Sequence, residues 1–345
     1  MNGRTPLIRR APLSNDIKKT MPKVSVIIPS YNHERYVSEA IQSVLDQTFQ
    51  DFEIIIVDDA SSDGTIAAIE KMQDPRIRLV KAPHNRAVHT RNTALRLAQG
   101  EYVAFQNSDD VWDRSKLEKQ IEILESQPST RACFTAVQPI DEKSTPLGGS
   151  WIDQLFTTKN RSSTEWLRNF FETGNCLCIT SAVVRREKIE ALGRFRESLI
   201  QMGDFDLWVR LAALGDFHII DTPLTRMRIF SNKGNVSAPT KEAGRRSAME
   251  CAEILSRYAE APVLDSVPQA FSFIFDAKAR SSAAYVAGLA RYAWQFGVAH
   301  HMFADRILAR LIDNPKTREE IVEAYGHQII LDFIKRRGAL DISLT

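Results

Sequence analysis

The first clear element of the chain is Val24-Ser25-Val26-Ile27-Ile28-Pro29, a short and almost uniformly apolar run that is rich in β-branched residues. Such a run is typical of a strand that is buried on both faces of a parallel sheet, and Pro29 ends it. Residues 34–48 then carry apolar side chains at helical spacing, which predicts an amphipathic helix. A buried strand followed by such a helix is the opening of a β-α-β unit.

The same alternation continues downstream of this unit. Strands are predicted at 52–57, 77–81 and 102–105, and helices at 66–72 and 90–98. Repeated units of this kind imply right-handed crossovers and a mostly parallel α/β sheet with helices on both faces. Polar loops follow three of the strands, at Ser30-Tyr31-Asn32, Asp58-Asp59 and Asn107-Ser108-Asp109-Asp110. Because ligands bind at the carboxyl ends of the strands in such sheets, the three loops predict a nucleotide site.

The rest of the chain carries weaker signals. Helices are predicted at 116–126, 166–171, 186–192 and 204–214, strands at 132–137 and 176–184, and a loop at 141–160. From about residue 241 onward, Ala, Arg, Leu and Ile recur at helical spacing with few strand signals. The predicted organisation is a flexible tail at 1–21, an α/β domain at 22–240 and an all-helical C-terminal region at 241–345.

Bulk composition fits an ordinary globular protein. The 345 residues are 43% hydrophobic, which is enough to bury a large core. A total of 45 Lys and Arg against 43 Asp and Glu leaves a formal net charge of +2, which argues against a nucleic-acid partner. The four cysteines form no zinc-binding pattern and are expected to be buried free thiols in a reducing compartment: Cys133, Cys176, Cys178 and Cys251.

The sequence contains no recognisable membrane or secretory segment. No stretch approaches the roughly 18 to 20 apolar residues of a membrane span, and the N-terminus lacks the apolar run of a signal peptide. A cytoplasmic protein is therefore expected. Residues 1–20 are polar and basic without periodicity, so a chain that started at Met21 is expected to contain the complete domain.

Asp109 and Asp110 directly follow a predicted buried strand. Two adjacent carboxylates repel each other, and a bound divalent cation would relieve this repulsion. Mg²⁺ or Mn²⁺ fits, because such hard cations are commonly held by one or two carboxylates together with substrate phosphates. The alternative is that these acids cap a following helix at 112–120, since Asp is common at helix starts.

Two further acidic positions have similar alternatives. Asp58 and Asp59 either form a harmless turn or accept hydrogen bonds from a base or a ribose, and they would repel phosphates. Asp204 begins a predicted amphipathic helix, where it is either a general base or an N-cap. Asp206 is expected to serve the dipole of that helix.

Basic residues near the predicted site are candidates to meet a diphosphate. Arg86 and Arg91 are better placed for this than His84 and His89, which are expected to face solvent. The glycines form neither a P-loop nor a dinucleotide-binding motif, which argues against a kinase or a dehydrogenase. The loop Ser30-Tyr31-Asn32-His33-Glu34 is neither glycine-rich nor basic, which argues against a nucleotidyltransferase.

Taken together, the segments 22–32, 52–65 and 100–110 resemble the family 2 glycosyltransferases. The resemblance covers about residues 22–235 and rests on three motifs in the family's order. It implies a GT-A fold, with a nucleotide-binding half at 22–112 and an acceptor-binding half at 113–240. It does not account for the C-terminal helices.

The resemblance also implies roles for individual residues. Asp58 and Asp59 would hold the base of the donor, with Asp59 the more direct contact, and Pro29 and Tyr31 would line the same pocket. Asp110 would be the principal metal ligand, and Asp109 would contact the ribose or the metal. Asp204 falls where the family places the catalytic base of an inverting transfer.

The chain departs from the family pattern at several positions. Asn107 replaces the first acid of the metal motif, and Gly203 stands where many members have Glu, although a Gly-Asp form also occurs in the family. Phe230 replaces a histidine in the segment 226–237, and Ala87 and Thr93 replace glycines. These departures are the basis of an alternative in which the donor geometry is altered or the activity is lost.

Two hypotheses follow from these observations. The first is an inverting transferase that uses a nucleotide diphosphate sugar, with a UDP-sugar favoured, in the synthesis of a polysaccharide, lipopolysaccharide or other glycan. Its acceptor would be a glycan, a lipid-linked sugar or a protein. The transferase itself would be cytoplasmic, with a peripheral contact at the inner face of the membrane. The second is an inactive module that binds a sugar nucleotide or a glycan on the same fold.

Overall fold

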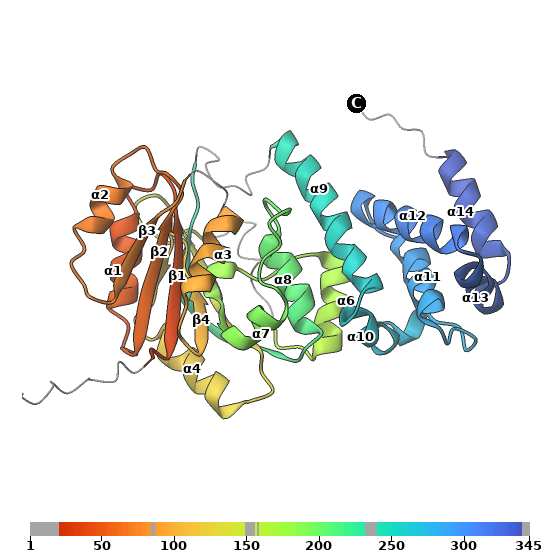
Figure 1. The fold of residues 1–345 in the computed structure, drawn as a ribbon, viewed down its shortest axis with the longest axis horizontal. Coiled ribbons are helices and arrows are strands. Elements are labelled where there is room, and N and C mark those ends of the chain that lie inside the picture. The colour runs from red at the N-terminus through yellow and green to blue at the C-terminus, as the bar shows by residue number, and fades with distance from the viewer. Residues whose placement is uncertain (1–20, 84–86, 149–155, 157–158, 232–239, 340–345) are drawn as a thin grey trace, which may run out of the picture.

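The computed structural model describes residues 21–83, 87–148, 156, 159–231 and 240–339. Figure 1 shows an elongated molecule, with a sheet and its helices at one end and a group of helices at the other. The tail predicted for 1–21 lies outside the described residues except for Met21. His84 and Arg86 also lie outside them.

An eight-stranded mixed sheet forms the first part, with the order β3-β2-β1-β4-β7-β6-β8-β5. Its strands are β1 (Val24–Ser30), β2 (Phe52–Asp58), β3 (Ile77–Lys81), β4 (Tyr102–Phe105), β5 (Val111–Trp112), β6 (Ala132–Ile140), β7 (Val183–Arg185) and β8 (Phe217–Arg228). The four consecutive strands β3, β2, β1 and β4 are parallel, and β6 is parallel to β8. The predicted mostly parallel α/β sheet is confirmed.

Helices cover both faces of this sheet (Figure 1). They are α1 (Val37–Leu45), α2 (Thr65–Glu70), α3 (Ala87–Leu97), α4 (Lys116–Ser126), α6 (Ser163–Thr173), α7 (Arg186–Ala191) and α8 (Gly203–Ala212). Alternate residues of β1 enter two cores: Val26 and Ile28 pack with α1 and α4, whereas Ile27 packs with α3, α6 and α8. The apolar run of β1 is therefore explained by burial on both faces.

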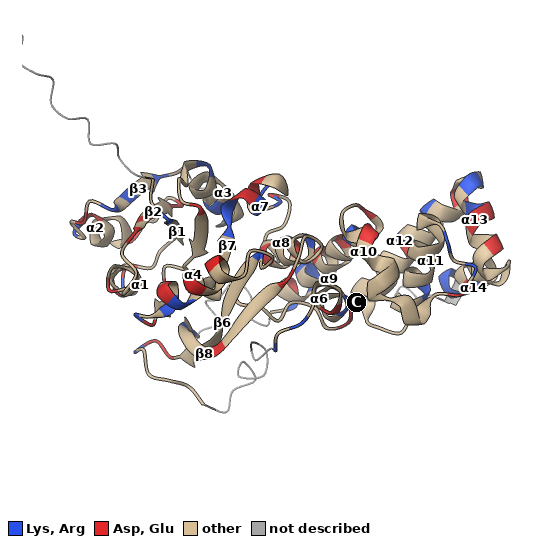
Figure 2. Ribbon diagram, turned by 90° about the horizontal axis from the view of Figure 1, so that it is seen from below, with Lys and Arg blue, Asp and Glu red and all other residues tan. Residues whose placement is uncertain are grey.

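The strands of the structure differ from the sequence-based expectation in two places. The strand predicted at 176–184 is present only as Val183–Arg185, because residues 179–181 form a 3-10 turn. The twelve-residue strand β8 is not predicted at all, since its middle is exposed and contains Pro223. That proline lies where the pairing of β8 with β6 shifts register, an irregularity that tolerates a residue without an N–H. Figure 2 shows β6 and β8 side by side as long strands.

The described part of the C-terminal region is helical, as predicted. Its helices are α9 (Lys241–Leu255), α10 (Val263–Ala270), α11 (Ser282–Ala293), α12 (Val298–Asp313), α13 (Pro315–Tyr325) and α14 (Gln328–Ala339). They share a hydrophobic core with the sheet, and the buried ring of Phe171 in α6 contacts Tyr258, Phe271 and Phe303. No described helix is both long enough and apolar enough to cross a membrane.

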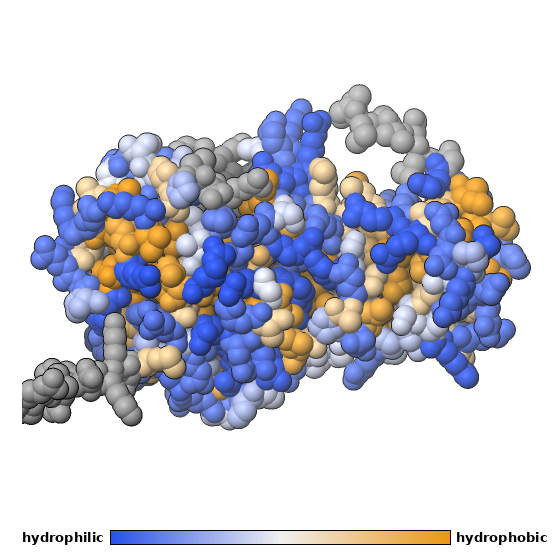
Figure 3. Space-filling model, viewed as in Figure 1, coloured by the Kyte–Doolittle hydropathy of each residue, from blue (hydrophilic) through white to orange (hydrophobic). Residues whose placement is uncertain are grey.

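Charge and hydropathy are mixed over the surface. Basic and acidic residues are both present on the C-terminal helices in Figure 2, in keeping with the small net charge. Figure 3 shows a face that is mostly hydrophilic, with apolar residues gathered at the sheet end near α1 and at the position of α14, a helix with exposed Leu331 and Ile334. None of the four cysteines forms a disulfide; Cys133 and Cys178 are buried, and Cys176 and Cys251 are partly buried.

One buried lysine makes the stability of the fold depend on pH. Lys116 is fully buried, donates a hydrogen bond to Gln120 Oε1 at 2.7 Å, and its Nζ lies 4.0 Å from the ring centroid of Trp112. Burial lowers the pKa of Lys116 to about 7. The unfolded chain therefore binds more protons at this position between that pH and its ordinary value of about 10.4, so stability rises with pH across this window.

We expect Lys116→Met to stabilise the protein at pH 7 by more than about 1 kcal/mol, because the ammonium is removed from an apolar site. The difference from wild type should shrink as the pH approaches 10. Urea denaturation at four pH values between 7 and 10 measures it, with the exposed Lys119→Met as the matched control. A difference that does not depend on pH would contradict the burial of a charged amine.

Candidate active site

Three loops meet at the carboxyl ends of β2, β1 and β4. The loop after β1 joins the other two, because His33 contacts both of them. The His33 N–H donates to Thr65 Oγ1 at 2.8 Å, and its ring Nδ1 lies 2.8 Å from Ser108 Oγ. Asn32 also accepts a hydrogen bond from the Ser62 N–H at 2.8 Å. The predicted site loops are therefore in direct contact.

Asp58 and Asp59 have different surroundings. The Asp58 carboxylate is fully buried and accepts hydrogen bonds from Ser30 Oγ at 2.6 Å and from both the N–H and the hydroxyl of Ser61. It therefore shapes the loop. Asp59 follows directly after the strand and is also buried, with its N–H donating to the Ser30 carbonyl at 2.9 Å. Tyr31 is 46% exposed beside this strand end, and Pro29 pairs with Val57 inside the sheet.

Asp109 and Asp110 are both buried at the end of β4. Asp110 Oδ1 accepts a hydrogen bond from the Arg228 N–H at 2.8 Å, and its Oδ2 accepts one from Asn107 Nδ2 at 3.0 Å. Burial raises the pKa of both carboxyls, and the charge of Asp109 raises the pKa of Asp110 further. The alternative that these acids cap the next helix is wrong, because α4 begins at Lys116 with Ser115 as its N-cap.

Arg228 is a site residue whose position the sequence pattern does not predict. Its fully buried guanidinium donates to the carbonyls of Asp109 and Asp141 and to the Glu39 carboxylate, each at 2.8 Å. It also lies 4.7 Å from the ring centroid of Tyr36. Because Arg228 ends the unpredicted strand β8, only the family-like spacing around it could have pointed to a role.

Arg91 interacts with both the loop at residues 107–110 and Asp204. Its guanidinium donates to Asn107 Oδ1 at 3.2 Å, and its positive charge acts against the raised pKa values of both Asp109 and Asp204. Burial in turn lowers the pKa of Arg91. Asn107 therefore serves both neighbours, since its amide donates to Asp110 and accepts from Arg91. A carboxylate at this position could not donate the first of these hydrogen bonds.

Asp204 lies in the first turn of α8 and is half-buried. Burial raises the pKa of its carboxyl, whose oxygens accept hydrogen bonds from the Phe205 N–H at 2.8 Å and from Asn175 Nδ2 at 3.2 Å. The N-cap of α8 is Met202, so the alternative role of Asp204 as N-cap is wrong. A Cβ at Gly203 would lie 3.3 Å from Val88 Cγ2, which leaves little room for a larger residue.

Asp206, His89 and Phe230 are three further residues about which the sequence led to an expectation. Asp206 does more than serve a helix dipole, because it is fully buried and forms ion pairs with Arg210 and Arg257. His89 is partly exposed and lies 3.4 Å from Glu197. The ring centroid of Phe230 is 6.1 Å from that of His33, so the loop after β1 brings an imidazole near the position where the family often has one.

The described residues supply few metal ligands. Among them, no group of three or more His, Cys, Asp and Glu side chains could hold a metal ion. Within the described part of the chain, Asp109 and Asp110 are the adjacent carboxylates at this strand end, and substrate phosphates and water would add further ligands. Such a donor set suits Mg²⁺ or Mn²⁺ in the presence of phosphates.

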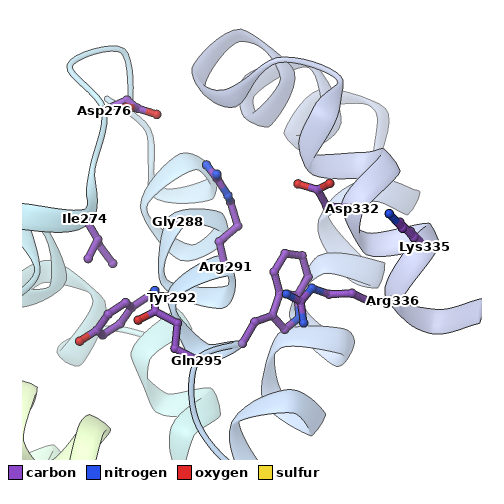
Figure 4. A pocket seen from close by; sticks show the side chains of 10 residues that line it. Ile274, Asp276, Gly288, Arg291, Tyr292, Gln295, Asp332, Lys335 and Arg336 are labelled. Carbon is purple, nitrogen blue, oxygen red and sulfur yellow. The ribbon is translucent and has the colours of Figure 1, made fainter. Parts of the chain in front are cut away.

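A separate cavity of about 770 Å³ lies in the C-terminal region, between α11 and α14. Figure 4 shows Arg291, Asp332, Lys335 and Arg336 around it. It contains none of the predicted site residues. The candidate active site is therefore defined by its converging side chains and not by the volume of a cavity.

Comparison with known proteins adds a family assignment. Residues 25–193 match the family model described as glycosyl transferase family 2. TuaG of Bacillus subtilis, named as a teichuronic acid biosynthesis glycosyltransferase, is 45% identical over 129 residues, which cover 36% of this chain and 51% of TuaG. The uncharacterized glycosyltransferase MJ1057 of Methanocaldococcus jannaschii is 31% identical over 227 residues, which cover 64% of this chain and 75% of MJ1057. The matches span about half or less of the first curated relatives.

Solved structures confirm the fold. Residues 1–349 of S. aureus TarS, solved in complex with UDP-GlcNAc, superpose with a TM-score of 0.56 at 19% identity, covering 92% of each chain. The mannosyltransferase PcManGT of Pyrobaculum calidifontis, solved with GDP-Man and Mn²⁺, gives a TM-score of 0.50 at 20% identity, covering 92% of this chain and 89% of that one. The predicted GT-A-type fold with a helical C-terminal region is confirmed.

The geometry around Asn107 gives a test of how the acidic pair is held. We expect Asn107→Asp to lower the free energy of unfolding at pH 8, in the absence of metal, by about 1–3 kcal/mol. The substitution removes a hydrogen-bond donor to Asp110 and adds a third carboxylate. Chemical denaturation in EDTA measures the change. Asn314→Asp is the matched control, since either residue can cap α13. An unchanged stability would show that the Asn107–Asp110 hydrogen bond does not hold the pair.

Proposed function

Since the chain belongs to glycosyl transferase family 2, we propose that it transfers a sugar from a nucleotide diphosphate donor to a hydroxyl acceptor, with inversion at the anomeric carbon. The observation that carries the proposal is the position of Arg91. The Arg91 guanidinium donates a hydrogen bond to Asn107, and its positive charge favours the ionised forms of the Asp109 and Asp204 carboxyls. A diphosphate and a proton acceptor would thus share one site.

The donor would lie with its base at the end of β2 and its diphosphate toward β4. Asp59 would contact the base, whereas Asp58, held by Ser30 and Ser61, would shape the pocket that Pro29 and Tyr31 line. Arg91 would face the diphosphate. A UDP-sugar is favoured, and the TarS structure with UDP-GlcNAc, a protein of the same fold, supports this choice.

A divalent cation would be held by Asp110, with Asp109 binding the cation or the ribose. The fit rests on two buried oxygen-ligand side chains whose ionisation is opposed by burial, so a cation would favour their charged form. When bound, Mn²⁺ or Mg²⁺ would neutralise charge on the departing diphosphate. The structure of PcManGT with GDP-Man and Mn²⁺ supports the same chemistry.

Asp204 would act as the general base. The acceptor hydroxyl oxygen forms a bond to the anomeric carbon while the bond to the diphosphate oxygen breaks, and the hydroxyl proton passes to the Asp204 carboxylate. Asn175 would orient that carboxylate through its hydrogen bond to Oδ2. Attack from the face opposite the leaving group inverts the anomeric configuration, and one correctly placed base is sufficient for this step.

The biological setting is inferred from the relatives and from the C-terminal helices. TuaG is named for teichuronic acid synthesis, which supports a role in making a polysaccharide, a lipopolysaccharide or another glycan. The acceptor would be a glycan, a lipid-linked sugar or a protein. We propose that the protein is cytoplasmic and lies peripheral to the inner face of the membrane. The exposed Leu331 and Ile334 on α14, beside Lys335 and Arg337, support the membrane contact.

The same fold supports a domain organisation. A GT-A domain at 22–240 would bind the donor through residues 22–112 and the acceptor through 113–240. The helices at 241–345 would form a separate C-terminal region. The second candidate is an inactive module that binds a sugar nucleotide or a glycan. It is favoured only by the departures from the family pattern, such as Phe230 in place of histidine.

Donor binding and turnover can be separated with two substitutions. We expect UDP-glucose or UDP-GlcNAc with Mn²⁺ to raise the melting temperature, because a ligand of the folded state stabilises it. Asp110→Asn should lose the Mn²⁺-dependent part of this shift. Asp204→Asn should keep the shift but lose donor turnover by between about 100-fold and 10,000-fold, as removal of a general base does.

The exposed Asp313→Asn is the control and should behave as wild type. Donor binding without turnover in the unmodified protein would favour the inactive module. Full turnover in Asp204→Asn would remove this residue from the role of base.

A further inference from the structure

Helix α9, the first helix of the C-terminal region, binds the segment that leads into α8, the helix that carries Asp204. Glu250 of α9 is 6% exposed, and its carboxylate accepts hydrogen bonds from three consecutive backbone N–H groups. Oε1 accepts from Ile200 at 2.9 Å, and Oε2 accepts from Gln201 at 3.0 Å and from Met202 at 2.8 Å. Hydrogen bonds to an ionised acceptor are among the stronger ones in proteins.

The clamped segment ends two residues before Asp204. Met202 is the N-cap of α8 and provides no side-chain hydrogen bond to it, so Glu250 fixes the entry into the helix from another part of the chain. A second contact supports the first, since Gln201 Nε2 donates to Ser247 Oγ, also in α9, at 2.9 Å. The backbone before Asp204 is therefore attached to α9 on consecutive residues.

The other side of Asp204 is held from the same region. Asp206 is fully buried and accepts a hydrogen bond from Arg257, in the turn after α9, at 3.1 Å. It also pairs with Arg210 of α8. Asp204 thus lies between two attachment points that both come from residues after 240, and Figure 1 shows α9 running beside α8.

We propose that Glu250 is a positioning residue for the general base, and that the C-terminal region is in this way part of the catalytic apparatus. This inference rests on the proposed function of Asp204. The mechanism is backbone geometry: with the Glu250 clamp released, the first turn of α8 is free to shift relative to the donor. A displacement of about 1 Å between reacting groups can cost about 100-fold in rate.

Glu250→Gln tests the proposal, because it keeps the size of the side chain but leaves one carbonyl oxygen for three N–H groups. The substrate is the UDP-sugar, UDP-glucose or UDP-GlcNAc, that raises the melting temperature with Mn²⁺. We expect kcat for its hydrolysis to fall by about 10-fold to 100-fold. The KM for the donor should change by less than about 2-fold, since the donor loops lie at β1, β2 and β4 and do not contact Glu250. Amide hydrogen exchange at 200–204 should become faster.

Glu253→Gln is the matched control. It lies one turn away on α9, and its carboxylate pairs with the Arg196 side chain and not with the 200–202 backbone. Equal losses of kcat in the two variants would overturn the proposal, as a general effect on stability. So would wild-type kcat in Glu250→Gln with faster exchange at 200–202.

Glu250→Asp guards against a variant that fails to fold, because it keeps the charge but cannot reach all three N–H groups. The same split between kcat and KM is expected from it, and wild-type kcat with faster exchange would again overturn the proposal. Asp204→Asn separates the two levels of inference. If that variant is inactive and the Glu250 variants are fully active, the clamp is refuted while the base is retained; if Asp204→Asn is active, the proposed function itself fails.

Discussion

Two adjacent carboxylates are buried at the end of a central strand, and the arrangement of the site follows from the need to stabilise them. Burial opposes the charged forms of Asp109 and Asp110 and raises the pKa of both carboxyls, so the polar groups nearby have to offset that cost. Arg228 supplies both a backbone N–H and a guanidinium, and Asn107 supplies an amide donor. Asn107 follows β4 and Arg228 ends β8, and β7 and β6 separate these two strands in the sheet, so the acidic pair joins two strand ends that do not pair with each other.

The helical C-terminal region is joined to this site through continuous packing. A single core extends from the sheet through α6 to α12, and the ring of Phe171 lies at the junction. Polar contacts follow the same path, because Glu250 and Arg257 bind the backbone and side chains on either side of Asp204. The region that the family resemblance does not cover is therefore the one that supports the candidate base.

The predictable part of the molecule is the part whose contacts are local. Apolar runs at β1, β2 and β4, each followed by polar residues, are sufficient to predict the sheet edge and its loops. Strand β8 escapes prediction because its pairing with β6 compensates for Pro223 and an exposed middle. Arg228 and Glu250 escape for a related reason: their partners lie 118 and 48 residues away in sequence, and no periodicity records such contacts.

The central claim is that the acidic pair, the base pocket and Asp204 face one bound nucleotide. Diffraction from crystals grown with UDP and MnCl₂, measured at the manganese absorption edge, tests it most directly. The account predicts one anomalous peak at coordination distance from the Asp110 carboxylate, with the uracil against Asp59 and the diphosphate toward Arg91 and Asp204. UDP bound elsewhere, or manganese bound away from Asp110 with the nucleotide present, would contradict it.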